Sequence, residues 1–223
     1  MAPRFPPRGD QPDPRDATKP SQGPAAAKPL TAARIRNIAE HYVGQRESSA
    51  QMLRDVLERR LLRRLRSLAP EVAAEERATA LALIDAEIAR LQEAGIIQDA
   101  RYAEMKARTA LSSGRGARRI LQDLARKGVE QDTARGALLE AAREMVDPEE
   151  TDPEGSDLLR AAEAEAADVF ARKRRFGPYR TRAVPEDWSE RSKLWRKEAA
   201  AMVRAGFGAD TIRRVLDRAP DEE

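Results

Sequence analysis

The sequence predicts an all-α protein, an elongated tandem array of three three-helix (helix-turn-helix-like) repeats preceded by a disordered tail. Composition is the first reason. The 223-residue chain has 4% aromatic and 35% charged residues and a mean hydropathy of −0.69. This balance is typical of helices with small contacts and much exposed surface. The second reason is that sustained period-2 alternation is absent, so we expect no strands.

A repeated segment is the third reason. When Arg126 is aligned with Arg204, Gly128 falls on Gly206. The other matching pairs are Asp132 with Asp210, Thr133 with Thr211, Arg135 with Arg213 and Leu138 with Leu216. A helix that ends in a basic residue and Gly, followed by a second helix, is therefore a repeated unit. Repeats of this kind stack and present one long surface, which favours binding of a long partner over a catalytic pocket.

Several classes of function are not expected from the composition. Cysteine is absent and His41 is the single histidine, so disulfides and thiolate metal sites are excluded and a zinc site is not expected. Apolar runs are shorter than the roughly 20 residues that span a bilayer, and the N-terminus lacks the apolar region of a signal peptide. We expect a cytoplasmic monomer that contacts no membrane and needs no metal or cofactor.

Charge is segregated along the chain. The formal net charge is +3 and the pI about 9.4, but residues 101–127 hold eight basic and two acidic side chains. Residues 172–182 hold six basic side chains and no acidic one, whereas residues 144–157 hold seven acidic side chains and no basic one. This pattern predicts two basic units that are separated by an acidic linker.

Residues 1–29 contain eight of the fourteen prolines and little apolar periodicity, so we expect a disordered tail there. The remaining units are a first, divergent repeat at 30–95, a second repeat at 96–146, an acidic linker at 147–156, and a third repeat at 157–219 with a basic loop at 172–187.

Capping and stop signals place the helices. Thr31 and Ser49 are candidate N-caps, and Pro70 suits a first helical position. The predicted helices span 31–42, from Ser48 or Ser49, from Pro70 to a stop at Gly95, 99–113, 116–127, 131–145, from Ser156, 189–204 and 209–219.

The helix from Asp99 is expected to turn Tyr102, Met105 and Thr109 inward, with Tyr102 packing between repeats. Gly128 is the expected C′ residue after the next helix, because only Gly enters the left-handed region without steric cost. Gly206 holds the matching place in the last unit. On this basis Gly128→Val is expected to destabilise the protein more than Gly116→Ala.

Two stretches resemble a known family. The C-terminal one consists of Arg204-Ala-Gly-Phe and the run from Ile212 to Leu216. The central one lies within residues 96–141 and consists of Asp99, Tyr102, Ala103, Arg108, Gly114, Gly116, Arg119, Ile120, Leu124, Lys127, Gly128 and Val129. Together they look like the signature of the RecX family, regulators of the recombinase RecA.

That resemblance implies a role in homologous recombination, DNA repair and the SOS response. RecX-like proteins are thought to lie in the helical groove of the RecA–DNA filament. The implied function is to bind this groove and to inhibit or modulate the ATPase and strand-exchange activities of RecA. The implied partners are the RecA filament and, in addition, single- or double-stranded DNA bound directly.

Two groups of cations are the candidate partner-binding residues, whether the partner surface is RecA or DNA phosphate. The middle group is Arg108, Arg115, Arg118, Arg119, Arg126 and Lys127. The last group is Arg172, Lys173, Arg174, Arg175, Arg180, Arg182 and Arg204. An ordinary solvated helix face is the alternative for the middle group. In the last group, Phe176 and Tyr179 either stack on bases or anchor the loop to the core.

A second function fits the same residues, a stand-alone nucleic-acid-binding protein built of helix-turn-helix-like repeats. The segment Ser113-Gly-Arg-Gly is either an anion site at a helix N-terminus or a flexible connector. It lacks the pattern of a nucleotide phosphate loop. An enzyme is not expected, because the sequence offers no cysteine nucleophile, metal cluster or Ser–His pairing.

Overall fold

The computed structural model describes residues 28–146 and 155–218. Within these ranges the chain forms nine α-helices, one short 3₁₀ helix and no strand, which confirms the predicted all-α class. The expected tail, except for residues 28 and 29, and the acidic linker up to residue 154 lie outside the described residues.

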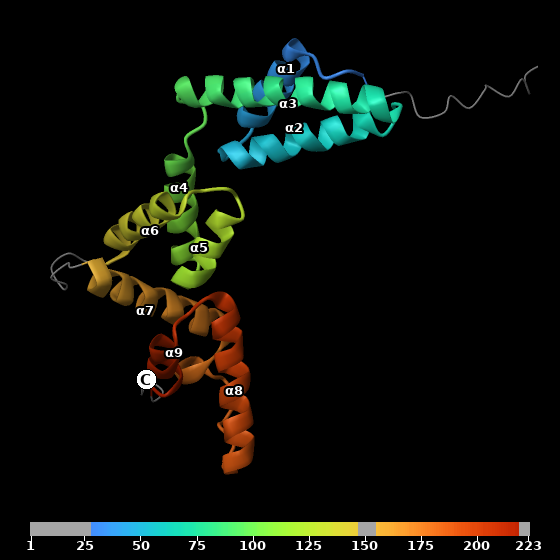
Figure 1. Ribbon diagram of the computed structural model, residues 1–223. Helices are drawn as coiled ribbons and strands as arrows, with labels where there is room; N and C mark the ends of the chain where they lie inside the picture. Colours follow the sequence, from blue (N-terminus) through green and yellow to red (C-terminus); the bar gives the residue numbers. More distant parts are fainter. Residues whose placement is uncertain (1–27, 147–154, 219–223) are drawn as a thin grey trace, which may run out of the picture.

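The first three helices form a group of their own (Figure 1). They are α1 (Ala32–Val43), α2 (Ala50–Leu65) and α3 (Pro70–Glu93). The predicted caps are confirmed, because Thr31 and Ser49 accept the N–H groups of Arg34 and Met52, and Pro70 opens α3. This group buries Ile35, Leu53, Leu57, Ile84 and Leu91 in a small core.

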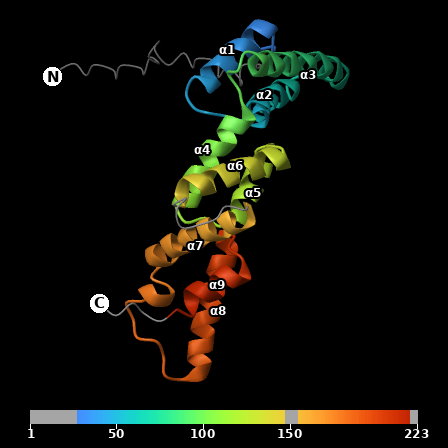
Figure 2. The same cartoon turned by 90° about the vertical axis from the view of Figure 1, so that its left-hand side faces the viewer.

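Six more α-helices form the rest of the array. The middle group is α4 (Asp99–Ser112), α5 (Ala117–Ala125) and α6 (Gln131–Met145). The last group is α7 (Gly155–Arg174), the 3₁₀ helix η1 (Gly177–Tyr179), α8 (Trp188–Ala205) and α9 (Ala209–Leu216). Figure 1 and Figure 2 show the three groups following one another along an elongated molecule, with α8 at the end opposite to α1–α3.

The middle and last groups share one core, whereas the first group has its own. The shared core is built largely of alanine, including Ala103, Ala107, Ala142, Ala162 and Ala166, all of which are fully buried. Small side chains let helices approach closely, so the interior needs few aromatic rings. A core is therefore shared by two of the three groups.

The buried face of α4 differs from the predicted one. Tyr102 is buried, as expected, but Thr109 is exposed and Met105 keeps 36% of its surface exposed. Ala107 and Leu111 face the core instead. The helix is turned so that its small residues meet the shared core. The periodicity alone favoured the larger side chains.

The two matched glycines end their helices in the same way. Gly128 and Gly206 have φ values of 75° and 97°. The N–H of Gly128 donates to the carbonyl of Ala125 (2.9 Å), and the N–H of Val129 donates to that of Leu124 (3.2 Å). This pair of bonds is the Schellman arrangement, in which Gly128 is C′. The predicted C′ role of Gly128 is therefore confirmed.

The helix ends at Gly128 and Gly206 also contact the preceding helix group. Ser49, at the start of α2, donates its hydroxyl to the carbonyl of Lys127 (2.6 Å). Gly116, at the start of α5, donates its N–H to the carbonyl of Ala205 (2.9 Å). Lys127 and Ala205 occupy matching places directly before the stop glycines. The same junction is therefore used twice along the array.

The second junction leaves no room for a side chain at Gly116. A Cβ built there would lie 2.3 Å from the carbonyl carbon and 2.4 Å from the oxygen of Gly206. The obstacle is backbone, so relief requires the middle and last groups to move apart. A Cβ at Gly128 would lie 2.4 Å from the Cβ of Gln51, and the positive φ at Gly128 strains any side chain there. Both glycines are therefore crowded, and Gly116→Ala is not expected to be a mild change.

Gly116→Ala is expected to lower the stability by about 1–3 kcal/mol through overpacking. For a chain of this size this corresponds to a fall in Tm of roughly 2–4 °C per kcal/mol. The control is Gly136→Ala, since a Cβ at Gly136 would meet nothing within 4 Å and Ala favours a helix interior. Thermal unfolding should show a lower Tm for the first variant and an unchanged or higher one for the second. Equal Tm values would contradict the close junction.

Candidate partner-binding site

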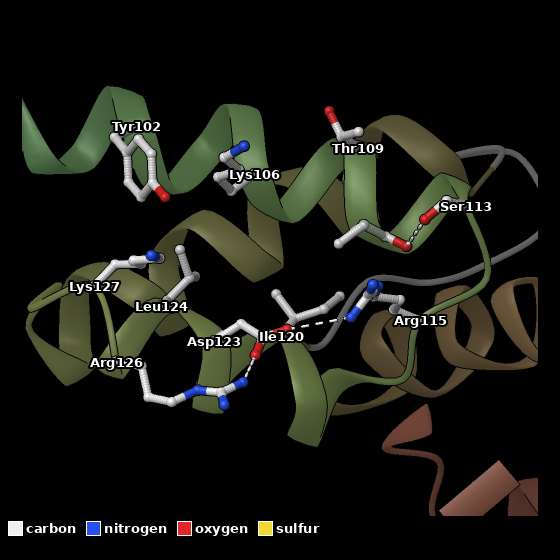
Figure 3. A pocket seen from close by; sticks show the side chains of 11 residues that line it. Tyr102, Lys106, Thr109, Ser113, Arg115, Ile120, Asp123, Leu124, Arg126 and Lys127 are labelled. Carbon is white, nitrogen blue, oxygen red and sulfur yellow. Dashed lines mark hydrogen bonds and ion pairs between the residues drawn. The ribbon is translucent and has the colours of Figure 1, made fainter. Parts of the chain in front are cut away.

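The first candidate site is a groove of about 600 Å³ between α4 and α5 (Figure 3). The α4 side contributes Tyr102, Lys106 and Thr109, and Figure 3 shows them opposite the side chains of α5 and its two ends. The remaining lining residues are Ala110, Ser113, Arg115, Ile120, Asp123, Leu124, Arg126 and Lys127. The floor is apolar and the rim is mostly cationic, so the groove suits a partner with acidic groups.

Asp123 is the centre of the ion pairs at this groove. Its carboxylate lies 3.3 Å from Arg115 and 3.2 Å from Arg119, and it also pairs with Arg126. Burial raises the pKa of Asp123, but the hydrogen bond from Arg126 and the charges of Arg119 and Arg126 outweigh it, so the pKa lies below its ordinary value. One carboxylate thus holds three guanidinium groups in place and neutralises only part of their charge.

Asp123→Asn should therefore have opposite effects on stability and on binding. Three exposed pairs are weakened, which costs less than about 1 kcal/mol each, while the groove gains one unit of positive charge. The stability difference should be present above a pH of about 4 and vanish as the pH falls through the lowered pKa. Affinity for an acidic partner should rise and become more dependent on salt. Weaker binding by a stably folded variant would show that Asp123 is needed to orient the arginines.

A second groove, of about 560 Å³, joins the middle and last groups. Among the described residues, its lining includes no acidic side chain; the residues are Ser113, Gly114, Arg115, Arg119, Phe170, Lys173, Arg174, Phe176, Ala201, Arg204 and Ala205. Lys173 donates to the carbonyl of Ser113 (3.1 Å), and the guanidinium of Arg174 lies 5.8 Å from the ring centre of Phe170. Helices α7 and α8 thus bring cations to the connector between α4 and α5.

Arg115 and Ser113 line both grooves, so the two form one surface. We call its cations the basic track: Lys106, Arg115, Arg119, Arg126, Lys127, Lys173, Arg174 and Arg204. Seven of these eight residues were predicted as partner-binding, and they come from both predicted groups. The fold therefore brings together residues that lie up to about one hundred positions apart in the sequence.

Six of the predicted cations do not line the basic track, and four of these lie elsewhere on the surface. Arg108 pairs with Glu144 of α6, and Arg118 is exposed but lines neither groove. Arg175 and Arg182 line a separate groove beside the loop that follows η1. The sequence groups them with the others only because they are close along the chain.

Two more predicted cations hold the last group together. Arg180 is only 16% exposed in its side chain, and it forms two hydrogen bonds, of 2.9 and 2.6 Å, to Glu198, which is 5% exposed. Glu198 also accepts the N–H of Gly177 (3.2 Å). Arg172 lies over the ring of Tyr179, 5.1 Å from its centre. Arg180 is therefore largely buried and paired inside the fold, and it does not line the basic track.

The two rings of the basic loop act as anchors. Phe176 packs against the shared core and meets Phe170 edge to face, with 6.1 Å between ring centres. The hydroxyl of Tyr179 accepts a hydrogen bond from Arg218 (2.8 Å). Of the two possibilities left open by the sequence, anchoring of the loop is the one that these contacts support.

Sequence reasoning missed Lys106 of the basic track and two exposed lysines of α8. Lys106 lines the first groove beside Tyr102, 5.8 Å from the ring centre. On α8, the missed residues Lys193 and Lys197 are exposed, as is the predicted Arg204. Their spacing places them on one side of the helix, and Arg204 lines the second groove. This helical periodicity was the signal that could have identified the α8 cations.

The described helices do not include one with the length and apolarity that crossing a bilayer requires. The fold and grooves define an all-α tandem-repeat protein with a cationic surface shared between repeats. A family model for "RecX, second three-helix domain" matches residues 99–138.

Two relatives extend the match over most of the chain. Regulatory protein RecX of Myxococcus xanthus (strain DK1622) is 30% identical over 202 residues, which are 91% of this chain and 94% of that protein. Regulatory protein RecX of Agrobacterium fabrum (strain C58 / ATCC 33970) is 30% identical over 187 residues, 84% of each. The crystal structure of RecX from Lactobacillus salivarius matches with a TM-score of 0.48 and 19% identity, over 83% of this chain and 96% of that one. The chain belongs to the RecX family, as the resemblance in its central signature indicated.

Proposed function

We propose that this protein regulates RecA by binding the RecA–DNA filament, with the basic track lying in the filament groove. Bound there, the chain inhibits or modulates the ATPase and strand-exchange activities of RecA. The observation that carries the proposal is the convergence of cations from both grooves on one surface. In the part of the chain that the structure describes, the second groove has no acidic lining residue.

The elongated shape supports a partner that is itself long. The three helix groups follow one another along the molecule (Figure 2), so contacts can be spread over neighbouring subunits of a filament. Weak contacts that are linked in one chain add through effective concentration. Binding can therefore be tight although each exposed ion pair contributes little.

Co-sedimentation with RecA filaments tests the proposal. The chain is mixed with RecA and ssDNA, with RecA alone and with ssDNA alone, at about 50 and 200 mM salt, and ATP hydrolysis is followed in parallel. We expect strong binding and altered hydrolysis only when RecA and ssDNA are both present, with weakening as salt rises. Failure to bind assembled filaments would overturn the proposal.

The same experiment separates the alternative function. A stand-alone nucleic-acid-binding protein would bind ssDNA or duplex DNA equally well without RecA, with a steep dependence on salt. The basic track alone is compatible with that result. Dependence on RecA is therefore the observation that distinguishes a filament regulator from a general DNA-binding protein.

A further inference from the structure

The first helix group carries a separate cationic patch on α2. Arg59, Arg63 and Arg66 are exposed and spaced by four and three residues, which places them along one side of the helix and its end. Leu62, between them, is 49% exposed. We name these four residues the α2 patch. None of them lines either groove of the basic track.

Two other arginines of α2 show that the fold can supply counter-charges. Arg54 pairs with Glu58 and Asp85, and Arg64 forms a two-pronged pair with Glu76. These partners lie on α2 itself or on α3. In the described residues, the arginines of the α2 patch have no carboxylate within ion-pair distance; Arg63 donates only to the backbone carbonyl of Arg59 (3.4 Å).

The helix itself does not account for this arrangement. Like charges one turn apart destabilise a helix. A cation in the last turn does complement the helix dipole, and this explains Arg63. It explains neither Arg59, which lies more than a turn before the end of α2, nor the exposure of Leu62 among cations. The α2 patch therefore has the composition of an interface that is not occupied within this chain.

The chemistry of the α2 patch favours a protein surface over nucleic acid. The Cα atoms of its three arginines lie within about 10 Å along the helix axis, given a rise of 1.5 Å per residue. The three side chains therefore form a compact patch and not a track. A phosphate backbone offers no apolar contact for the exposed leucine at the centre of the patch. Arginine is, in contrast, enriched at protein–protein interfaces, whose buried centre is more apolar than the rim.

We infer that the α2 patch is a second docking site, which takes an acidic protein surface with an apolar contact for Leu62, independently of the basic track. The inference rests on the proposed function, and in the filament this partner surface belongs to the RecA polypeptide. The first helix group thereby anchors the chain to protein while the basic track follows the groove. Its separate core lets this group act as a unit of its own.

Site-specific photo-crosslinking tests the inference. The photoreactive residue p-benzoylphenylalanine replaces Leu62, Thr109 of the first groove, or Val72 in separate full-length variants, and each is irradiated with RecA filaments on end-labelled ssDNA. Val72 is the control, because it is 52% exposed in the same helix group but lies on α3. We expect the Leu62 variant to crosslink to RecA polypeptide, at least tenfold more than the Val72 variant.

The arginines are tested in the same assay. Arg59→Gln, Arg63→Gln and Arg66→Gln together should reduce the Leu62 crosslink at least fivefold and leave the Thr109 crosslink in place. Crosslinking of Leu62 to DNA, or of Leu62 and Val72 equally, would overturn the inference. So would a crosslink from Thr109 without one from Leu62, which would leave the proposed function intact. If neither position crosslinks and wild-type protein does not co-sediment, the proposed function fails and the inference fails with it.

Discussion

Reversing Arg115, Lys173 and Arg204 to Glu together is expected to weaken binding to RecA–ssDNA filaments by about tenfold to a hundredfold. The three residues lie on the α4–α5 connector, α7 and α8, and all line the second groove. A loss of about 0.5–1 kcal/mol per exposed contact, summed over three contacts, gives this range, since 1.4 kcal/mol corresponds to a tenfold change in affinity. Filament co-sedimentation gives the affinity, and ATP hydrolysis by RecA should lose its response to the variant in parallel.

A matched control separates local from general charge effects. Arg135, Arg143 and Arg213 are equally exposed, and each pairs with an acidic residue one turn earlier on α6 or α9. Their reversal to Glu changes the net charge by the same amount but leaves the basic track untouched. We expect this control to bind within about threefold of wild type. Equal weakening of both triple variants would mean that overall charge, not the basic track, governs binding.

Arg180→Met is expected to give the largest loss of stability, about 3 kcal/mol. The substitution leaves the buried carboxylate of Glu198 with the N–H of Gly177 as its remaining partner, and an unpaired buried charge is costly. Urea unfolding followed by helical circular dichroism measures the effect. Arg182→Met is the matched control, because Arg182 is exposed and forms no ion pair within the described residues.

A double variant checks the cause of that loss. Arg180→Met combined with Glu198→Leu removes both charges, so it should recover much of the stability that the single change loses. If Arg180→Met is as stable as Arg182→Met, the ion pair is not what holds the basic loop. If the double variant is less stable than either single one, packing around the pair outweighs its charge.

The features that could be predicted from the sequence are those with a local cause. Thr31 and Ser49 cap helices because their hydroxyls accept N–H groups three residues on, and Gly128 ends α5 because its backbone enters the left-handed region. These signals lie within a few residues of the element that they control. The repeat of the Gly stop at Gly206 then predicted the array.

The features that could not be predicted depend on contacts between distant residues. The burial of Arg180 requires Glu198 from another element, and the crowding at Gly116 comes from the backbone of Gly206. Met105 is exposed because the small side chains of α4 face the shared core. Arg108 was set apart from the basic track by Glu144 on α6. Charge counted along the chain cannot identify which cations are neutralised in the fold.

Hydrogen–deuterium exchange of the full chain, with and without RecA–ssDNA filaments, tests the central claim most directly. The amides of a contact surface are protected from exchange when the partner binds. We predict protection over residues 113–119, 172–176 and 201–206, which surround the second groove, and little change over α9. Protection confined to α6 and α9, with unchanged exchange around Arg115 and Arg204, would contradict the account.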